Sequence, residues 1–154
     1  MSAMRIALLF LAGITLQGCQ QPENFDDAEQ SVSLFHDRLN LALYEEIWEL
    51  TAPGFGEAQV REDARAVFSA MHSRLGLVLD SEIIDASFYT SSEEGAMVTL
   101  VYRTTFERGS GTEIFTFATE SGASLLLNYN ISSRDFSGED VSDYQRLAES
   151  AVQR

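Results

Sequence analysis

Lysine is absent from this 154-residue sequence, and cysteine and histidine are nearly absent. All ten basic residues are arginines, whereas 24 residues are acidic, so the formal net charge is −14. A chain this acidic repels the phosphate backbone, which argues against a nucleic-acid partner. The same charge disfavours attachment to anionic lipid head groups. The single cysteine, Cys19, excludes an intramolecular disulfide.

The familiar motifs of enzymes are missing as well. The two histidines, His36 and His72, do not form a cluster with Cys, Asp or Glu at metal-ligand spacing. No Ser-His-Asp or Cys-His pattern and no phosphate-binding glycine loop occurs. The sequence therefore predicts no catalytic residue, no metal and no cofactor. Each histidine falls at the edge of a predicted helix, where we expect a half-exposed boundary residue.

A short apolar run is present at the N-terminus. Residues 6–16 are too few to span a bilayer comfortably, and they predict an export signal. The sequence LQGC at residues 16–19 resembles a bacterial lipoprotein signal, in which Cys19 is diacylated and becomes the first mature residue. The alternatives are an ordinary signal peptide with a chance cysteine, or a buried N-terminal helix.

The lipoprotein resemblance implies a place in the cell. Acyl chains such as palmitate on Cys19 would hold the protein in the membrane, facing the periplasm, and two or more chains anchor stably. Gln20, rather than Asp, follows the cysteine and favours the outer membrane over the inner one. The predicted organisation is a signal peptide (1–18), the lipidated cysteine with a tether (19–24), a folded domain (25–134) and a polar, helical C-terminal segment (135–154).

Two helices are predicted at the start of the folded domain. The first runs from Phe25 to about Thr51, because apolar residues recur at helical spacing, namely Val32, Phe35, Leu39, Leu43, Ile47 and Leu50. The second runs from about Val60 to Leu75, and Gly76 stands where a left-handed C-terminal cap belongs. Its predicted core residues are Ala64, Val67, Phe68, Met71 and Leu75.

Four antiparallel strands are predicted next. Residues 77–90 return the chain to an extended form, with Ile84, Ala86 and Phe88 alternating. Residues 98–133 then alternate apolar and polar side chains through three strands joined by glycine-containing turns. Such a sheet has one apolar face, which the helices would cover. The predicted buried positions are Val98, Leu100, Tyr102, Phe106, Phe115, Phe117, Leu125, Leu127, Tyr129 and Ile131.

Five short segments carry a family resemblance: residues 44–48 (YEEIW), 74–76 (RLG), 98–104 (VTLVYRT), 113–115 (EIF) and 128–131 (NYNI). Together with two helices followed by four strands, they resemble the nuclear transport factor 2-like superfamily and its cystatin-like cone. The resemblance implies an α+β fold, with two N-terminal helices packed on one face of a curved four-stranded antiparallel sheet and a short C-terminal helix. That superfamily includes isomerases, dehydratases, ligand binders and dimerising modules, so the fold barely constrains function.

Two sets of residues are candidates for function. In the cone, Tyr102, Glu113 and Tyr129 share the apolar face of their strands, and a carboxylate there could serve as a base. The simpler interpretation is two packing tyrosines and a glutamate beside a solvated turn. On the open sheet face, a mixed polar surface suits a homodimer or a protein partner, and equally a face that is simply solvated. Its residues are Arg103, Thr105, Thr116, Asn128 and Asn130.

The leading hypothesis from the sequence is a lipid-anchored, non-enzymatic envelope protein that binds a partner protein or a small apolar ligand. The alternative is a small enzyme of the isomerase, dehydratase or hydrolase type that uses the cone cavity. A buried carboxylate or a histidine lining a pocket would favour the enzyme. A filled cone would favour the binding module.

Overall fold

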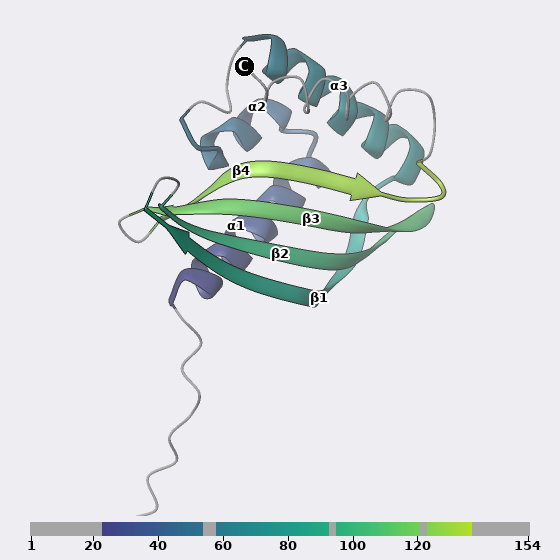
Figure 1. Ribbon diagram of the computed structural model, residues 1–154. Coiled ribbons are helices and arrows are strands. Elements are labelled where there is room, and N and C mark those ends of the chain that lie inside the picture. Colours follow the sequence, from purple (N-terminus) through teal and green to yellow (C-terminus); the bar gives the residue numbers. More distant parts are fainter. Residues whose placement is uncertain (1–22, 54–57, 93–94, 121–122, 137–154) are drawn as a thin grey trace, which may run out of the picture.

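The computed structural model describes residues 23–53, 58–92, 95–120 and 123–136. Within these ranges, three α-helices and one 3₁₀ turn precede four β-strands (Figure 1). The helical elements are α1 (Glu23–Asn40), α2 (Tyr44–Ile47), η1 (Trp48–Leu50) and α3 (Ala58–Leu75). The strands are β1 (Val78–Ser91), β2 (Gly95–Phe106), β3 (Gly109–Glu120) and β4 (Ala123–Ser132).

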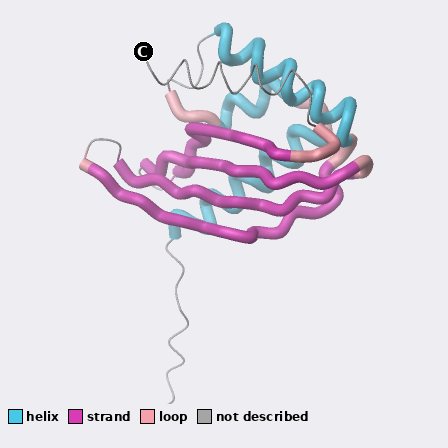
Figure 2. The backbone as a smooth tube through the Cα atoms, turned by 45° about the vertical axis from the view of Figure 1, so that its right-hand side comes forward, coloured by secondary structure: helices cyan, strands magenta, loops and turns pink. Residues whose placement is uncertain are grey.

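The described strands form one antiparallel sheet in the order β1-β2-β3-β4, so each strand pairs with its neighbour in the sequence. Figure 1 shows α1 crossing one side of the curved sheet and α3 lying beyond β4. Figure 2 shows the helices gathered on that same side, while the opposite face of the sheet carries none of the described helices. This arrangement confirms the predicted α+β fold and the placement of the helices on one sheet face.

Aromatic side chains fill the space between the helices and the sheet. The ring centroid of Phe35 in α1 lies 5.4 Å from Phe68 in α3, 5.2 Å from Phe115 in β3 and 4.7 Å from Tyr129 in β4. All four side chains are buried. Burying large aromatic rings removes much apolar area from water, so this cluster joins both long helices to the sheet. The predicted core face of the second helix is confirmed by its buried residues, Ala64, Phe68, Met71 and Leu75, with Val67 packed against them.

The predicted first helix is wrong beyond Asn40. There α1 ends, Ala42 takes a left-handed conformation (φ 55°), and α2 and η1 resume the helical path. The cause lies at Asn40, whose side-chain amide donates to the carbonyl oxygen of Val78 (3.0 Å) and whose Oδ1 accepts from the Val78 N–H (2.7 Å). These two bonds fasten the end of α1 to the start of β1. Leu43, predicted to be buried, is 36% exposed at the break.

A β-bulge interrupts the alternation predicted for β4. Thr116 pairs with Asn128 and Phe117 pairs with Leu126, so Leu127 is the extra residue. An extra residue exchanges the two faces of the strand on one side of the bulge. Leu126 therefore lies in the core at 2% exposure, whereas Leu127, predicted to be buried, is only partly covered.

Away from the bulge, the predicted buried face of the sheet is confirmed. Its buried members are Val98, Leu100, Tyr102, Phe106, Phe115, Phe117, Tyr129 and Ile131. Leu125, which precedes the bulge in the chain and was predicted to be buried, is partly covered like Leu127. The regular cross-strand register of β2 with β3 explains why simple alternation succeeds there.

The two edges of the sheet differ. At β4, Thr51 forms a parallel bridge with Leu126, and the N–H of Ala52 donates to the Leu126 carbonyl oxygen (2.9 Å). At β1, no described segment pairs with the outer edge. A bulge at Ile84 breaks the alternation predicted for β1. In addition, α1 packs on β2, β3 and β4 rather than on β1. Phe88 is consequently 45% exposed.

Several predictions fall on residues outside the described ranges. These are the signal peptide, Cys19 with most of the tether, and the C-terminal segment after Phe136. Phe136 itself is buried, so the core extends just past the predicted boundary at residue 134. Among the helices that the structure describes, none combines the length and apolar character needed to cross a membrane.

Candidate functional site

Glu113 lies within β3 and is fully buried. The sheet pairs it with Tyr102 of β2 and Ile131 of β4, on the face that the helices cover. We expected Glu113 beside a solvated turn, and this expectation is wrong because β3 already begins at Gly109. A buried ionisable side chain is stable only if its polar atoms are bonded.

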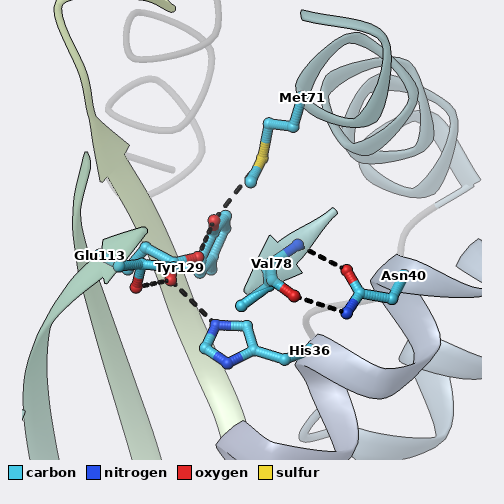
Figure 3. Close-up of polar contacts among 7 residues, drawn as sticks. His36, Asn40, Met71, Val78, Glu113 and Tyr129 are labelled. Carbon is cyan, nitrogen blue, oxygen red and sulfur yellow. Dashed lines mark hydrogen bonds and ion pairs between the residues drawn. The ribbon is translucent and has the colours of Figure 1, made fainter. Parts of the chain in front are cut away.

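Three side chains supply those bonds, as Figure 3 shows in part. Nε2 of His36 lies 2.9 Å from Oε2 of Glu113, and the Thr104 hydroxyl donates to the same oxygen. The Tyr129 hydroxyl donates to Oε1 over 2.7 Å. We call these four residues the Glu113 network. Its members come from α1, β2, β3 and β4, so one carboxylate joins the first helix to three adjacent strands.

His36 was expected at the half-exposed edge of its helix, and this expectation is wrong. The residue is 6% exposed, and its ring stands edge-on to Phe115 (5.8 Å between centroids) and Tyr102 (6.3 Å). Because Nε2 faces a carboxylate, we assign the hydrogen to Nε2, which leaves a lone pair on Nδ1. Within the described part of the chain, Nδ1 has no hydrogen-bond partner, and this atom is not completely buried.

A groove of about 600 Å³ opens beside the Glu113 network, between α1 and β1, and we call it the α1–β1 groove. It exists because α1 packs over the other three strands and leaves this edge of the sheet uncovered. Its lining comprises Glu29, Val32, Ser33, His36, Asp37 and Asn40 from α1, Val78, Leu79, Asp80, Ser81 and Ile83 from β1, and Tyr102 from β2. His36 is thus shared by the network and the groove.

Tyr102 lines the groove beside His36 and is itself buried. Burial raises the pKa of its hydroxyl to about 12, and the negative charges of Glu29 and Glu113 act in the same direction. The phenol therefore stays protonated at neutral pH. In that form it can donate a hydrogen bond to a group in the groove.

These parts together make up a candidate acid–base site at the edge of the cone. His36 offers a lone pair, Glu113 holds the imidazole in place, and Tyr102 offers a donor. The interior of the cone is filled by the aromatic cluster around Phe35. A ligand would therefore reach His36 from the α1–β1 groove, and a central cavity is not needed for access.

The other histidine stays apart from this site. His72 is half-buried in α3, as expected, and its Nδ1 lies 3.2 Å from the Tyr44 hydroxyl. It does not line the α1–β1 groove. Within the described residues, no three potential metal ligands of the Asp, Glu, His and Cys types come together.

The residues predicted for the open sheet face lie on the side without helices. Arg103, Thr105 and Asn128 are exposed, and Thr116 and Asn130 are partly covered. Thr116 and Asn128 pair directly across β3 and β4. Arg103 does not stand free, because its Nη1 lies 3.4 Å from Oε2 of Glu82 on the neighbouring strand β1.

The sequence already contained signals for the Glu113 network. Glu113 shares its alternation with Phe115 and Phe117, and we considered it as a candidate base for that reason. His36 follows Val32 by four positions and precedes Leu39 by three, which places it on the apolar stripe of α1. What the sequence analysis missed is the approach of these two residues to each other.

No protein-family model matches the sequence, and no curated protein matches it either. Among solved structures, the chain is similar to Aln2 from a Streptomyces species, with a TM-score of 0.53 and 12% sequence identity over 75% of this chain and 93% of that one. It is also similar to a scytalone dehydratase-like protein from Novosphingobium aromaticivorans, with a TM-score of 0.48 and 14% identity over 71% of this chain and 83% of that one.

The first of these similarities bears on the fold. The superposition covers nearly the whole of Aln2. Because the sequence identity is low, the similarity shows a shared fold and nothing about function. The chain therefore shares its fold with Aln2, and the predicted cone-shaped α+β fold is confirmed. Function has to be argued from the site itself.

Proposed function

We propose that the α1–β1 groove is a catalytic site for proton transfer and that His36 is its base. One observation carries the proposal: Nε2 of His36 lies 2.9 Å from the buried carboxylate of Glu113, while the same histidine lines an open groove. A histidine held by a carboxylate is well suited to general base catalysis, because its tautomer and its orientation are fixed before the substrate arrives. The filled interior of the cone favours the non-enzymatic module, whereas the buried carboxylate and the histidine that lines a groove favour the enzyme hypothesis. We give the pair more weight, because it stands at an open groove beside the filled interior.

In the proposed reaction, a substrate places a weakly acidic C–H bond against Nδ1 of His36. The lone pair of Nδ1 takes the proton, and Glu113 stabilises the imidazolium through Nε2–H. The electron pair left on the substrate moves toward a neighbouring oxygen, which accepts a hydrogen bond from Tyr102. Returning the proton to another atom completes an isomerisation. Transferring it to a departing hydroxyl group, which leaves as water, completes a dehydration.

Thr104 and Tyr129 are positioning residues in this scheme. Both donate to the Glu113 carboxylate, one to each oxygen, and neither lines the α1–β1 groove. They hold the carboxylate that in turn holds His36. Their removal should alter the rate through the orientation of the imidazole, without direct contact to the substrate.

Proton abstraction can be tested with simple compounds. Small ketones and β-hydroxy carbonyl compounds are incubated with the protein in D₂O, and exchange at the carbon next to the carbonyl is followed by NMR. We expect the wild type to accelerate exchange of at least one compound, and His36→Gln to lower that rate about 100-fold or more. The control is His72→Gln, which removes the histidine outside the groove and should retain the rate. Exchange no faster than in buffer for every compound, or equal rates in both variants, contradicts the proposal.

A second candidate function is supported by the uncovered sheet face. We propose that Arg103, Thr105, Thr116, Asn128 and Asn130 form a contact surface for a second copy or for another envelope protein. The supporting observation is that none of the described helices covers this face. Lipidation of Cys19, with the anchored protein facing the periplasm from the outer membrane, remains a proposal that rests on the sequence.

A further inference from the structure

We propose that the ligand of the α1–β1 groove is an organic cation, with an ammonium group attached to an apolar body. This inference rests on the proposed function, because it names the substrate class of the same groove. It is carried by the uncompensated negative charge of the lining, by the apolar side chains that share the lining, and by His36 at the inner side.

The charge of the groove is one-sided. Glu29, Asp37 and Asp80 line it, and no arginine does. In the described part of the chain, arginines form ion pairs with carboxylates outside the groove, as in Arg38–Glu49, Arg65–Glu45, Arg103–Glu82 and Arg108–Glu107. No ion pair of the described residues neutralises the three groove carboxylates. A positively charged ligand would supply the missing charge.

Many surfaces of a chain with this net charge are acidic, so acidity alone does not identify a cation site. The groove differs from them because buried His36 lines it. The residue is more than nine-tenths buried and lines the groove, and within the described residues its Nδ1 has no hydrogen-bond partner. Asp37 and Asp80 are exposed, so they mark the outer side of the groove, whereas buried His36 marks the inner side. We infer that the ammonium group lies near the carboxylates and that the reacting atom lies against Nδ1.

Apolar side chains also line the groove. Val32 comes from α1, and Val78, Leu79 and Ile83 come from β1. They provide contact for a hydrocarbon body, and a volume of about 600 Å³ lies in the range of small-molecule sites. The raised pKa of Tyr102, to which Glu29 and Glu113 contribute after burial, agrees with a negative potential in the groove.

A bare metal ion fits this lining less well than an organic cation. Metal ions require several ligands that converge on one point. The carboxylates here lie on different elements, α1 and β1, and the described residues hold no convergent group of three or more ligands. Charges spread along a groove instead favour an elongated ligand.

Binding of matched probes tests the inference. The protein is titrated at low ionic strength with 2-phenylethylamine, with the neutral 2-phenylethanol and with the anionic phenylacetate, by calorimetry and by NMR. We expect the amine to bind at least about tenfold more tightly than the alcohol, and phenylacetate not to bind. The amine's advantage should shrink with added salt. Equal affinity for amine and alcohol, or no binding of the amine at millimolar concentration, overturns the inference.

Variants locate the bound cation. Asp37→Asn and Glu29→Gln should each weaken amine binding about three- to tenfold, because each removes one nearby charge. The matched control is Glu62→Gln, which removes an exposed carboxylate on α3 outside the groove and should leave the affinity unchanged. An equal loss in Glu62→Gln and Asp37→Asn would show that overall charge attracts the amine, and this would overturn the groove as its site.

The two proposals fail in different ways. Amine binding is measured without turnover, whereas His36→Gln is used only to test proton exchange. If the amine binds in the groove and no compound exchanges, the proton-transfer function is wrong and the cation site stands. If neutral ketones exchange through His36 and the amine has no advantage over the alcohol, the cation inference is wrong and the function stands.

Discussion

Nε2 of His36 and Oε2 of Glu113 lie 2.9 Å apart, and neither residue is more than 6% exposed. Withdrawing such groups from water costs several kcal/mol unless new bonds replace the lost hydration. Thr104 and Tyr129 supply two of those bonds. The carboxylate that orients the proposed base is therefore one whose bonds must be kept once it is buried.

Removing that carboxylate should destabilise the protein strongly. Glu113→Ala leaves the donors of His36, Thr104 and Tyr129 without their acceptor, and we expect the free energy of unfolding to fall by about 3–5 kcal/mol. Urea denaturation followed by circular dichroism measures the loss. Glu113→Gln keeps the size and one acceptor oxygen and should lose less. A loss below about 1 kcal/mol for Glu113→Ala would show that the network contributes little.

The bulge in β4 gives a prediction about two adjacent leucines. Leu126→Ala should lower the free energy of unfolding by about 2–5 kcal/mol, because Leu126 is buried in the core. Leu127→Ala is the matched control, with the same chemical change at a partly covered position, and should lose clearly less. Denaturant melts of the two variants decide the matter. The reverse order would mean that the register of β4 is displaced by one residue.

Alkaline pH should act on stability through Tyr102. Its pKa is raised from 10.0 to about 12, so between these values the phenol is ionised in the unfolded chain and protonated in the folded one. This contribution to stability is complete below pH 10 and is lost as pH rises through 12, at about 1.4 kcal/mol per pH unit. Unfolding is compared at about pH 9, 10 and 11. Tyr102→Phe should lose less stability over this range than the wild type and than Tyr89→Phe, which changes an exposed tyrosine. Parallel pH dependence in Tyr102→Phe and the wild type would refute this prediction.

The open sheet face can be tested by charge reversal. Arg103→Glu places a second carboxylate beside Glu82 and should weaken self-association or partner capture while the fold persists. Arg65→Glu is the control, because Arg65 has a similar exposed pair with Glu45 on the helical side. Sedimentation and membrane pull-down compare the soluble forms, with circular dichroism as the folding check. Unchanged behaviour of a folded Arg103→Glu protein would remove this face from consideration.

The proposed lipid anchor is tested at Cys19. Cys19→Ser removes the thiol that receives the acyl chains, so metabolic labelling with palmitate should be lost and the precursor should remain uncleaved at that site. Mass spectrometry of the mature wild-type protein provides the direct check. A mature chain without acyl groups would show that the lipoprotein resemblance misleads.

Local patterns predicted those parts of the fold that depend on local spacing. The faces of β2 and β3 followed from alternation, and α3 ended at Leu75 before Gly76, which has φ 79° as a left-handed cap requires. The end of α1 did not follow, because Asn40 bonds to Val78, which lies 38 positions away in the chain. The bulge at Leu127 depends on cross-strand register, which a single strand does not reveal.

The candidate site could be predicted only in part for the same reason. Alternation placed Glu113 and Tyr129 on the apolar face, and both are buried there. The partner of Glu113 is His36, 77 positions away, and their contact depends on how α1 crosses the sheet. The α1–β1 groove depends on the same crossing, because it is the part of the sheet that α1 does not cover.

The unequal edges of the sheet limit how copies of this protein could join by strand pairing. Thr51 and Ala52 occupy the outer side of β4 at Leu126, whereas the outer side of β1 has no partner among the described segments. A growing fibril needs two free edges on every molecule, one to join the stack and one to extend it. The short segment after η1 therefore interrupts the outer edge of β4 at Leu126, so strand addition there meets an obstacle that is absent along β1.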